Sequence, residues 1–136
     1  MPPNTLRWLR ILFLVSAVWN FAGAVPGLSD PAGMFAREFG RDLTDPTMIA
    51  IYRGAWGTAF IYGLGFLLVA KDPARHSAIV LMGGVGKALF AANLLYMYLQ
   101  SWTSDFALVV IIGDLVFIVL FALYFLTLKR NGIRIV

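Results

Sequence analysis

The sequence predicts an all-α membrane protein, built as an antiparallel, up-down bundle of four transmembrane helices. Of its 136 residues, 60% are hydrophobic and 13% are charged, whereas a soluble domain carries about 25% charged residues. The apolar residues also fall into runs of about 20, the length of helix that crosses the hydrocarbon of a bilayer. A chain this short makes one domain, so residues 1–136 form a single transmembrane unit.

The spans are expected at about residues 8–28, 48–70, 77–99 and 106–128. Lys and Arg concentrate before the first span, in the connection after residue 70, and after the fourth span, whereas the other two loops are net acidic. Positively charged loops stay in the cytoplasm. Both termini are therefore expected on the cytoplasmic side, in a multi-pass protein of a bacterial inner membrane.

Aspartate-proline pairs predict where helices begin, because aspartate caps a helix and proline suits its first turn. Span one is expected to end at Pro26-Gly27, and Asp30-Pro31 then starts a short interfacial helix in the first outer loop. That helix would place Met34, Phe35 and Phe39 on the membrane and Arg37, Glu38 and Arg41 in water. An ordinary loop is the alternative. Asp45-Pro46 and Asp72-Pro73 are expected to start the next two spans.

The connection after residue 70 is so short that the spans on either side must form an antiparallel hairpin. Small residues recur at four-residue spacing, which lets helices approach closely. They are Gly54 and Thr58, Ala59 and Gly63, and Gly84, Ala88 and Ala92.

Lys87 and Asp114 both lie near the middle of their spans, where either charge alone would cost about 2.5–3.5 kcal/mol. We therefore expect them to pair inside the bundle. The pair has two readings, a structural clamp that fixes helix register or part of a functional site. Buried ion pairs stabilise less well than apolar packing, which favours a further use.

Three more polar residues of the spans are candidates for the same site: Asn20, Arg53 and Asn93. Arg53 either snorkels toward the outer acidic loop or faces inward to bind an anionic or carbonyl group. Each asparagine either makes an interhelical hydrogen bond or contacts a ligand. If these residues converge above Lys87 and Asp114, with Trp19, Tyr52 or Trp56 alongside, they make a polar intramembrane pocket.

Several kinds of chemistry lack their residues. There is no cysteine and one histidine, His76, so neither thiolate metal sites nor paired-histidine haem sites are expected. Gly83 to Lys87 resembles a phosphate-binding loop, but Ala88 replaces the required Ser or Thr and the segment lies inside a span. We expect no catalytic residue, metal, cofactor or nucleic-acid partner, and the chain leans away from being an enzyme.

The layout of Trp19 to Gly23, Asp72-Pro73, Gly86-Lys87 and Gly113-Asp114 resembles small uncharacterised bacterial four-span proteins, loosely DoxX-like in architecture. The resemblance implies the four-span fold and no particular activity.

The leading functional interpretation is a protein that binds membrane lipid or a small amphipathic molecule at Asn20, Arg53, Lys87, Asn93 and Asp114. The alternatives are a small ion- or proton-coupled transporter using Lys87 and Asp114, an accessory subunit of a larger membrane complex, and a membrane-embedded isomerase. A transporter of four helices would require a homo-oligomer, because so few helices leave little room for a path.

Overall fold

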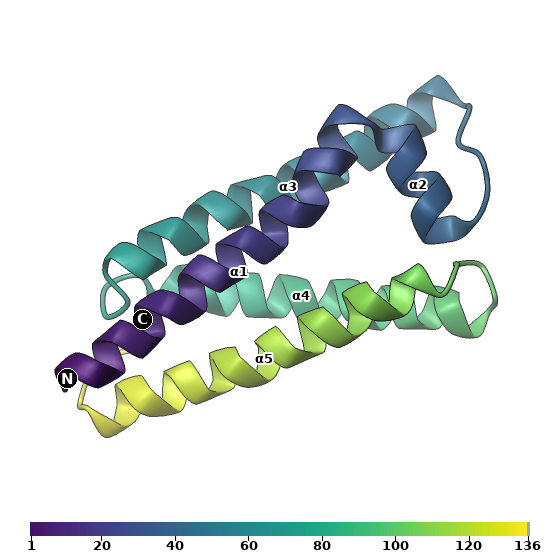
Figure 1. The fold of residues 1–136 in the computed structure, drawn as a ribbon. Coiled ribbons are helices and arrows are strands. Elements are labelled where there is room, and N and C mark those ends of the chain that lie inside the picture. Colours follow the sequence, from purple (N-terminus) through teal and green to yellow (C-terminus); the bar gives the residue numbers. More distant parts are fainter. Residues whose placement is uncertain (136) are drawn as a thin grey trace.

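The computed structural model describes residues 1–135, which are largely helical. The helices are α1 (Pro3–Ser29), α2 (Pro31–Phe39), α3 (Pro46–Lys71), α4 (Ser77–Leu99) and α5 (Phe106–Arg130). All but α2 are long and apolar enough to cross a membrane, and they run alternately up and down (Figure 1). The predicted multi-pass bundle of four spans, with a short helix between the first two, is confirmed.

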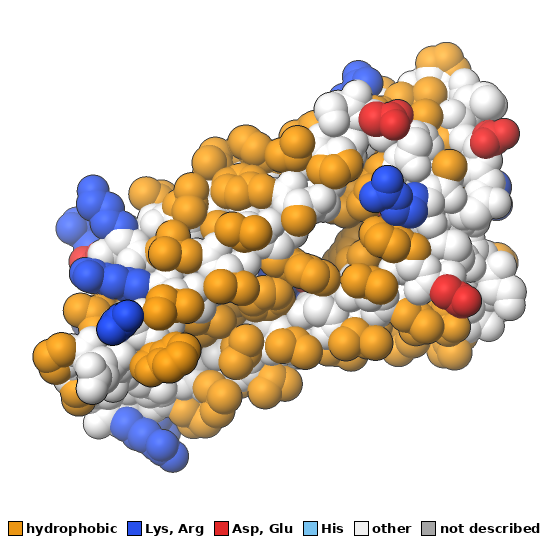
Figure 2. Space-filling model, in the orientation of Figure 1, with side chains coloured by type: hydrophobic (Ala, Val, Ile, Leu, Met, Phe, Trp, Pro, Cys, Tyr) orange, Lys and Arg blue, Asp and Glu red, His pale blue; other side chains and the backbone are white. Residues whose placement is uncertain are grey.

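The outer surface of the bundle is apolar, as contact with lipid requires. Side chains such as Ile61 and Leu89 are 65% and 68% exposed, respectively. Figure 2 shows hydrophobic side chains over the middle of the visible face, Lys and Arg mixed with Asp and Glu at one end, and mainly Lys and Arg at the end near the chain termini. We call this the terminal end of the bundle, and the opposite end the α2 end. The excess of basic over acidic side chains at the terminal end agrees with the expected cytoplasmic position of both termini.

The spans form two pairs that separate toward the α2 end. α1 packs along α3 and α4 along α5, and the pairs meet near the chain termini (Figure 1). An aromatic core joins them there, with ring centroids 5.0 Å apart for Phe13 and Tyr124 and 5.3 Å apart for Phe66 and Phe121. The Tyr124 hydroxyl also donates to the Pro73 carbonyl at 2.6 Å. The bundle is therefore closed at the terminal end only.

This arrangement corrects the expected packing of the second and third spans. α3 and α4 are neighbours at their short turn, but the main partner of α3 is α1. Gly63 explains the preference, since a Cβ there would lie 2.6 Å from the Phe21 ring of α1. Gly54, Thr58, Ala88 and Ala92 are exposed instead, so the prediction of close helix approach at those four positions is wrong.

Two helix ends also differ from expectation. α1 continues through Pro26 to Ser29, because Gly27 gives the Trp56 ring of α3 a place to pack against a continuous helix. α4 begins after His76, and Asp72 lies at the C-terminal cap of α3 instead. The other two capping predictions are confirmed, as the Asp30 and Asp45 side chains accept from the backbone N–H three residues on.

Candidate functional site

A cavity of about 490 Å³ lies between the two helix pairs, where they separate. All five helices line it, through residues that include Trp19, Glu38, Trp56, Lys87 and Asp114. Its walls are mostly apolar, and its volume falls within the roughly 300–1,000 Å³ of small-molecule sites. The cavity also opens sideways, since lining residues of all four spans, among them Ala22, Thr58, Phe90 and Val109, are exposed on the lipid-facing surface. Figure 2 shows the opening between the pairs.

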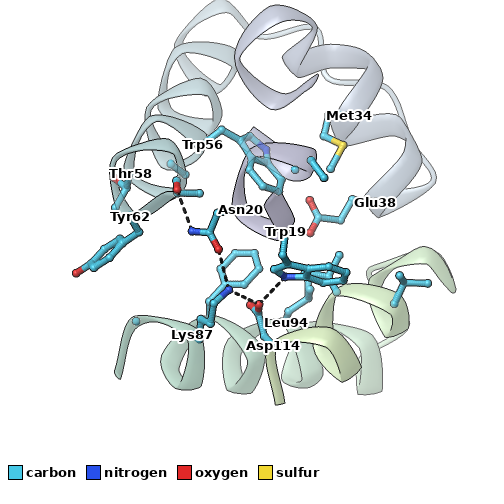
Figure 3. A pocket seen from close by; sticks show the side chains of 18 of the residues that line it. Trp19, Asn20, Met34, Glu38, Trp56, Thr58, Tyr62, Lys87, Leu94 and Asp114 are labelled. Carbon is cyan, nitrogen blue, oxygen red and sulfur yellow. Dashed lines mark hydrogen bonds and ion pairs between the residues drawn. The ribbon is translucent and has the colours of Figure 1, made fainter. Parts of the chain in front are cut away.

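A polar network closes the floor of the cavity (Figure 3). Lys87 Nζ lies 2.7 Å from Asp114 Oδ1 and donates to Asn20 Oδ1 at 3.0 Å. The Asn20 amide donates to the Ala59 carbonyl at 2.9 Å, and Trp19 Nε1 donates to Asp114 Oδ1 at 3.0 Å. The network thus draws two groups from α1 and one from each of the other spans, and it ties the two pairs together at the point where they separate.

The predicted Lys87–Asp114 pair is confirmed. Lys87 is 8% exposed and Asp114 is 5% exposed, so each charge has its counter-charge within the bundle. Gly113 contributes to the geometry, since a Cβ at that position would collide with the Trp19 ring. A side chain there would therefore displace the indole that donates to Asp114.

The structure brings together three of the five predicted site residues: Asn20, Lys87 and Asp114. Arg53 and Asn93 are exposed and do not line the cavity. Their heights along the bundle match the cavity, but successive helical residues turn by about 100°, and Arg53 points away from the side of α3 that carries Tyr52 and Ala59. The expected convergence therefore fails for Arg53 and Asn93.

Glu38 corrects the expected orientation of α2. Instead of facing water it is 1% exposed and lines the cavity, because it shares one buried face of α2 with Pro31 and Met34. Tyr52 donates to Glu38 Oε2 at 2.6 Å, while Oε1 is buried without a hydrogen-bond partner. Burial raises the pKa of Glu38 above 4.5, and the hydrogen bond from Tyr52 opposes the rise. The spacing of Pro31, Met34 and Glu38 was the available sequence signal.

α2 spans the gap between the two helix pairs at the wide end of the cavity (Figure 1). It follows α1 directly, through the Asp30 cap. Its other end is held by Ser104 of the α4–α5 loop, whose hydroxyl donates to the Arg37 and Glu38 carbonyls and whose N–H donates to the Glu38 carbonyl at 2.8 Å. α2 is thus a cover fixed to both pairs.

The interior charges differ from the expected set of two positive and one negative. With Arg53 outside and Glu38 inside, the buried charged residues of the cavity lining are one basic residue, Lys87, and two acidic residues, Asp114 and Glu38. Among residues 1–135 the structure has one ion pair, and it is the Lys87–Asp114 pair. The buried group without a counter-charge is therefore a carboxyl, not a guanidinium.

No protein-family profile, curated protein or solved structure matches this chain.

Proposed function

We propose that this protein binds a small amphipathic molecule, which enters the cavity between the helix pairs from the surrounding bilayer. The cavity itself carries the proposal. Its volume of about 490 Å³ and its mostly apolar walls suit a largely apolar molecule, and a few fixed polar groups supply orientation, as in small-molecule sites generally.

The side openings support entry from the lipid phase. A molecule in the bilayer can reach the cavity through the side openings, where lining residues are exposed. From the aqueous α2 end, α2 covers the cavity. The apolar tail of such a molecule can then lie along the apolar part of the cavity, between the helix pairs, while its polar group lies next to the polar residues of the cavity.

The floor network supports a positioning role for Lys87, Asn20 and Asp114. Because the Lys87 ammonium is neutralised by Asp114 and bonded to Asn20, the floor limits the depth of the cavity without adding a net charge. Desolvation makes such a pair a poor source of stability, which favours a use in shaping the site.

Two glycines provide a matched test. Gly86 lines the cavity and Gly54 does not, and at neither position would a Cβ meet another atom within 4 Å. Gly86→Leu should therefore fill the cavity and Gly54→Leu should add the same side chain elsewhere. With decanol as the probe and the protein in nanodiscs, native mass spectrometry should count bound decanol on the wild type and on Gly54→Leu, and little on Gly86→Leu.

Equal binding of decanol by all three proteins would overturn the proposal, since the probe would then adhere to the lipid-facing surface. A second protein that co-purifies with the wild type and with Gly54→Leu, but is lost from Gly86→Leu, would also overturn it. That result would favour an accessory subunit whose partner occupies the gap between the helix pairs.

A further inference from the structure

Glu38 is the one carboxyl of the cavity lining whose counter-charge is absent. Its side chain points into the cavity in Figure 3, is 1% exposed and has one oxygen, Oε1, without a partner. Buried charges are normally paired, and an unpaired one either takes up a proton or awaits a partner. An occupant of the cavity is in a position to be that partner.

The basic side chains of the cavity lining contact groups other than Glu38. Lys87 is bound to Asp114 and Asn20 at the floor. Arg37, next to Glu38 on α2, also lines the cavity, but it is exposed, makes no ion pair with Glu38 and holds its guanidinium 5.7 Å from the centre of the Phe106 ring. The groups that α3 and the α4–α5 loop bring to the Glu38 side chain and backbone are uncharged donors: the Tyr52 hydroxyl, and the hydroxyl and N–H of Ser104. No basic side chain among residues 1–135 pairs with Glu38.

Aromatic rings lie around Tyr52, the hydrogen-bond partner of the carboxyl. Tyr52, which donates to Glu38, has ring neighbours Phe35 at 5.2 Å, Trp56 at 6.1 Å and Phe39 at 6.3 Å between centroids. Tyr52, Trp56 and Phe39 also line the cavity. The faces of such rings attract organic cations, tryptophan most strongly.

We propose that the cavity selects amphiphiles with a cationic head group, such as an alkylammonium, and that Glu38 with its aromatic neighbours binds that head at the α2 end. This inference rests on the proposed function and adds the charge of the ligand to it. The apolar tail occupies the space between the helix pairs, where the lining is apolar.

Binding of the cation competes with a proton. In the empty cavity, burial raises the pKa of Glu38, and a bound cation favours the ionised carboxylate. Where Glu38 carries a proton, the cation must therefore displace that proton to bind. Its affinity falls as the pH drops, whereas the affinity of a neutral amphiphile does not.

Three probes with the same tail separate the head-group preference from binding itself: decyltrimethylammonium, decanol and decanoate. Each is titrated against the wild type, Glu38→Gln, Gly86→Leu and Gly54→Leu in nanodiscs of zwitterionic lipid, and bound probe is counted by native mass spectrometry. The wild type and Gly54→Leu should prefer the cation. Glu38→Gln should weaken binding of the cation by about tenfold or more, the scale for a truncated buried charge pair, and should weaken binding of decanol much less than that.

The outcomes distinguish the two proposals. If Gly86→Leu binds every probe as well as the wild type does, the proposed function fails. If decanol binds through Gly86 but the cation binds no better than decanol or decanoate, or Glu38→Gln leaves cation binding unchanged, the head-group inference alone is overturned. Should Glu38→Gln not fold, a pH series on the wild type decides: loss of cation binding at low pH with constant decanol binding supports the inference, and parallel curves overturn it.

Discussion

Lys87 and Asp114 illustrate how strongly the cost of burying a charge constrains single residues. The ammonium and carboxylate are 2.7 Å apart inside the bundle, and each would be unpaired without the other. Removing one partner of a buried pair costs about 3–5 kcal/mol, whereas replacing both with apolar residues is often neutral. The two substitutions should therefore be strongly non-additive.

We expect Lys87→Met alone to lower the free energy of unfolding by about 3–5 kcal/mol, because it leaves Asp114 buried beside Trp19 without a cation. The double variant Lys87→Met with Asp114→Leu should lose less than either single variant. Thermal unfolding in mild detergent, followed by circular dichroism, measures both. Costs that simply add would show that the two charges are not coupled.

Glu38 predicts a pH dependence of stability whose sign follows from its raised pKa. The folded protein holds the Glu38 proton more tightly than the unfolded chain, so this contribution to stability is complete below about pH 4.5 and is lost as the pH rises through the folded-state pKa. Glu38→Gln should remove that loss. The melting temperature of Glu38→Gln should therefore exceed that of the wild type by a margin that grows as the pH rises through the folded-state pKa of Glu38. Above that pH the margin should stay constant.

Asp42→Asn is the matched control for this measurement, because Asp42 is exposed on the loop after α2. Its melting temperature should differ from that of the wild type by an amount that does not grow over the same pH range. A wild type that gains on Glu38→Gln as the pH rises would contradict the assigned direction of the pKa.

At the residue scale, the sequence sufficed for the Lys87–Asp114 pair because depth along the two spans placed both charges at one level, and the cost of burial made a partner necessary. Depth did not reveal rotation about the helix axis. Arg53 and Asn93 lie at a suitable height and on the wrong side, whereas Glu38 looked like an aqueous residue because its neighbours Arg37 and Arg41 are charged.

Among the elements, α2 depends on a short loop for its position. Within residues 1–135, Ser104 supplies the hydrogen bonds between the α4–α5 loop and the C-terminal turn of α2. Each side-chain hydrogen bond contributes about 0.5–1.5 kcal/mol. A single substitution at Ser104 should therefore weaken the attachment of α2 to the second helix pair.

Ser104→Ala should speed hydrogen exchange of the α2 amides several-fold, because it removes the hydroxyl that holds the Arg37 and Glu38 carbonyls. Hydrogen-exchange mass spectrometry of peptides covering Pro31–Phe39 measures it. Ser29→Ala is the control, since the Ser29 hydroxyl bonds to its own helix at Val25. Unchanged exchange in Ser104→Ala would mean that the backbone hydrogen bond from residue 104 and the apolar contacts hold α2 without the hydroxyl.

The helix starts show where element-level prediction succeeds. Asp30 and Asp45 cap the helices that follow them, as local chemistry dictates. Asp72-Pro73 carries the same signal but forms a turn, because the tertiary hydrogen bond from Tyr124 to Pro73 holds that segment. Pro26 failed as a helix end for a similar reason, since Trp56 packs against the adjacent Gly27.

For the molecule as a whole, the distribution of basic side chains predicts orientation in the membrane. The chain contains no cysteine, so single cysteines can be introduced without a background. Thr44→Cys, at the α2 end, should react with a membrane-impermeant maleimide in intact cells. Asn131→Cys, at the terminal end, should react only after the cells are opened. The reverse pattern would contradict the expected topology.

The four spans were predictable because hydropathy and length are properties of each segment alone. The choice of partners was not, because it depends on which ring fits which small residue across the bundle. The Phe21 ring of α1 packs against Gly63 of α3, and no pattern within either helix indicates that contact. The cavity follows from this pairing, and the sequence predicted it only as a polar intramembrane pocket.

The separation of the helix pairs at one end gives the molecule a tapered outline along the membrane normal (Figure 1). A tapered protein takes up more area in one leaflet than in the other. Any movement of the two pairs about the aromatic core at the narrow end would change the area in that one leaflet. Lateral pressure and curvature of the bilayer would then act on the occupancy of the cavity, so that the lipid matrix itself becomes a physical input to binding.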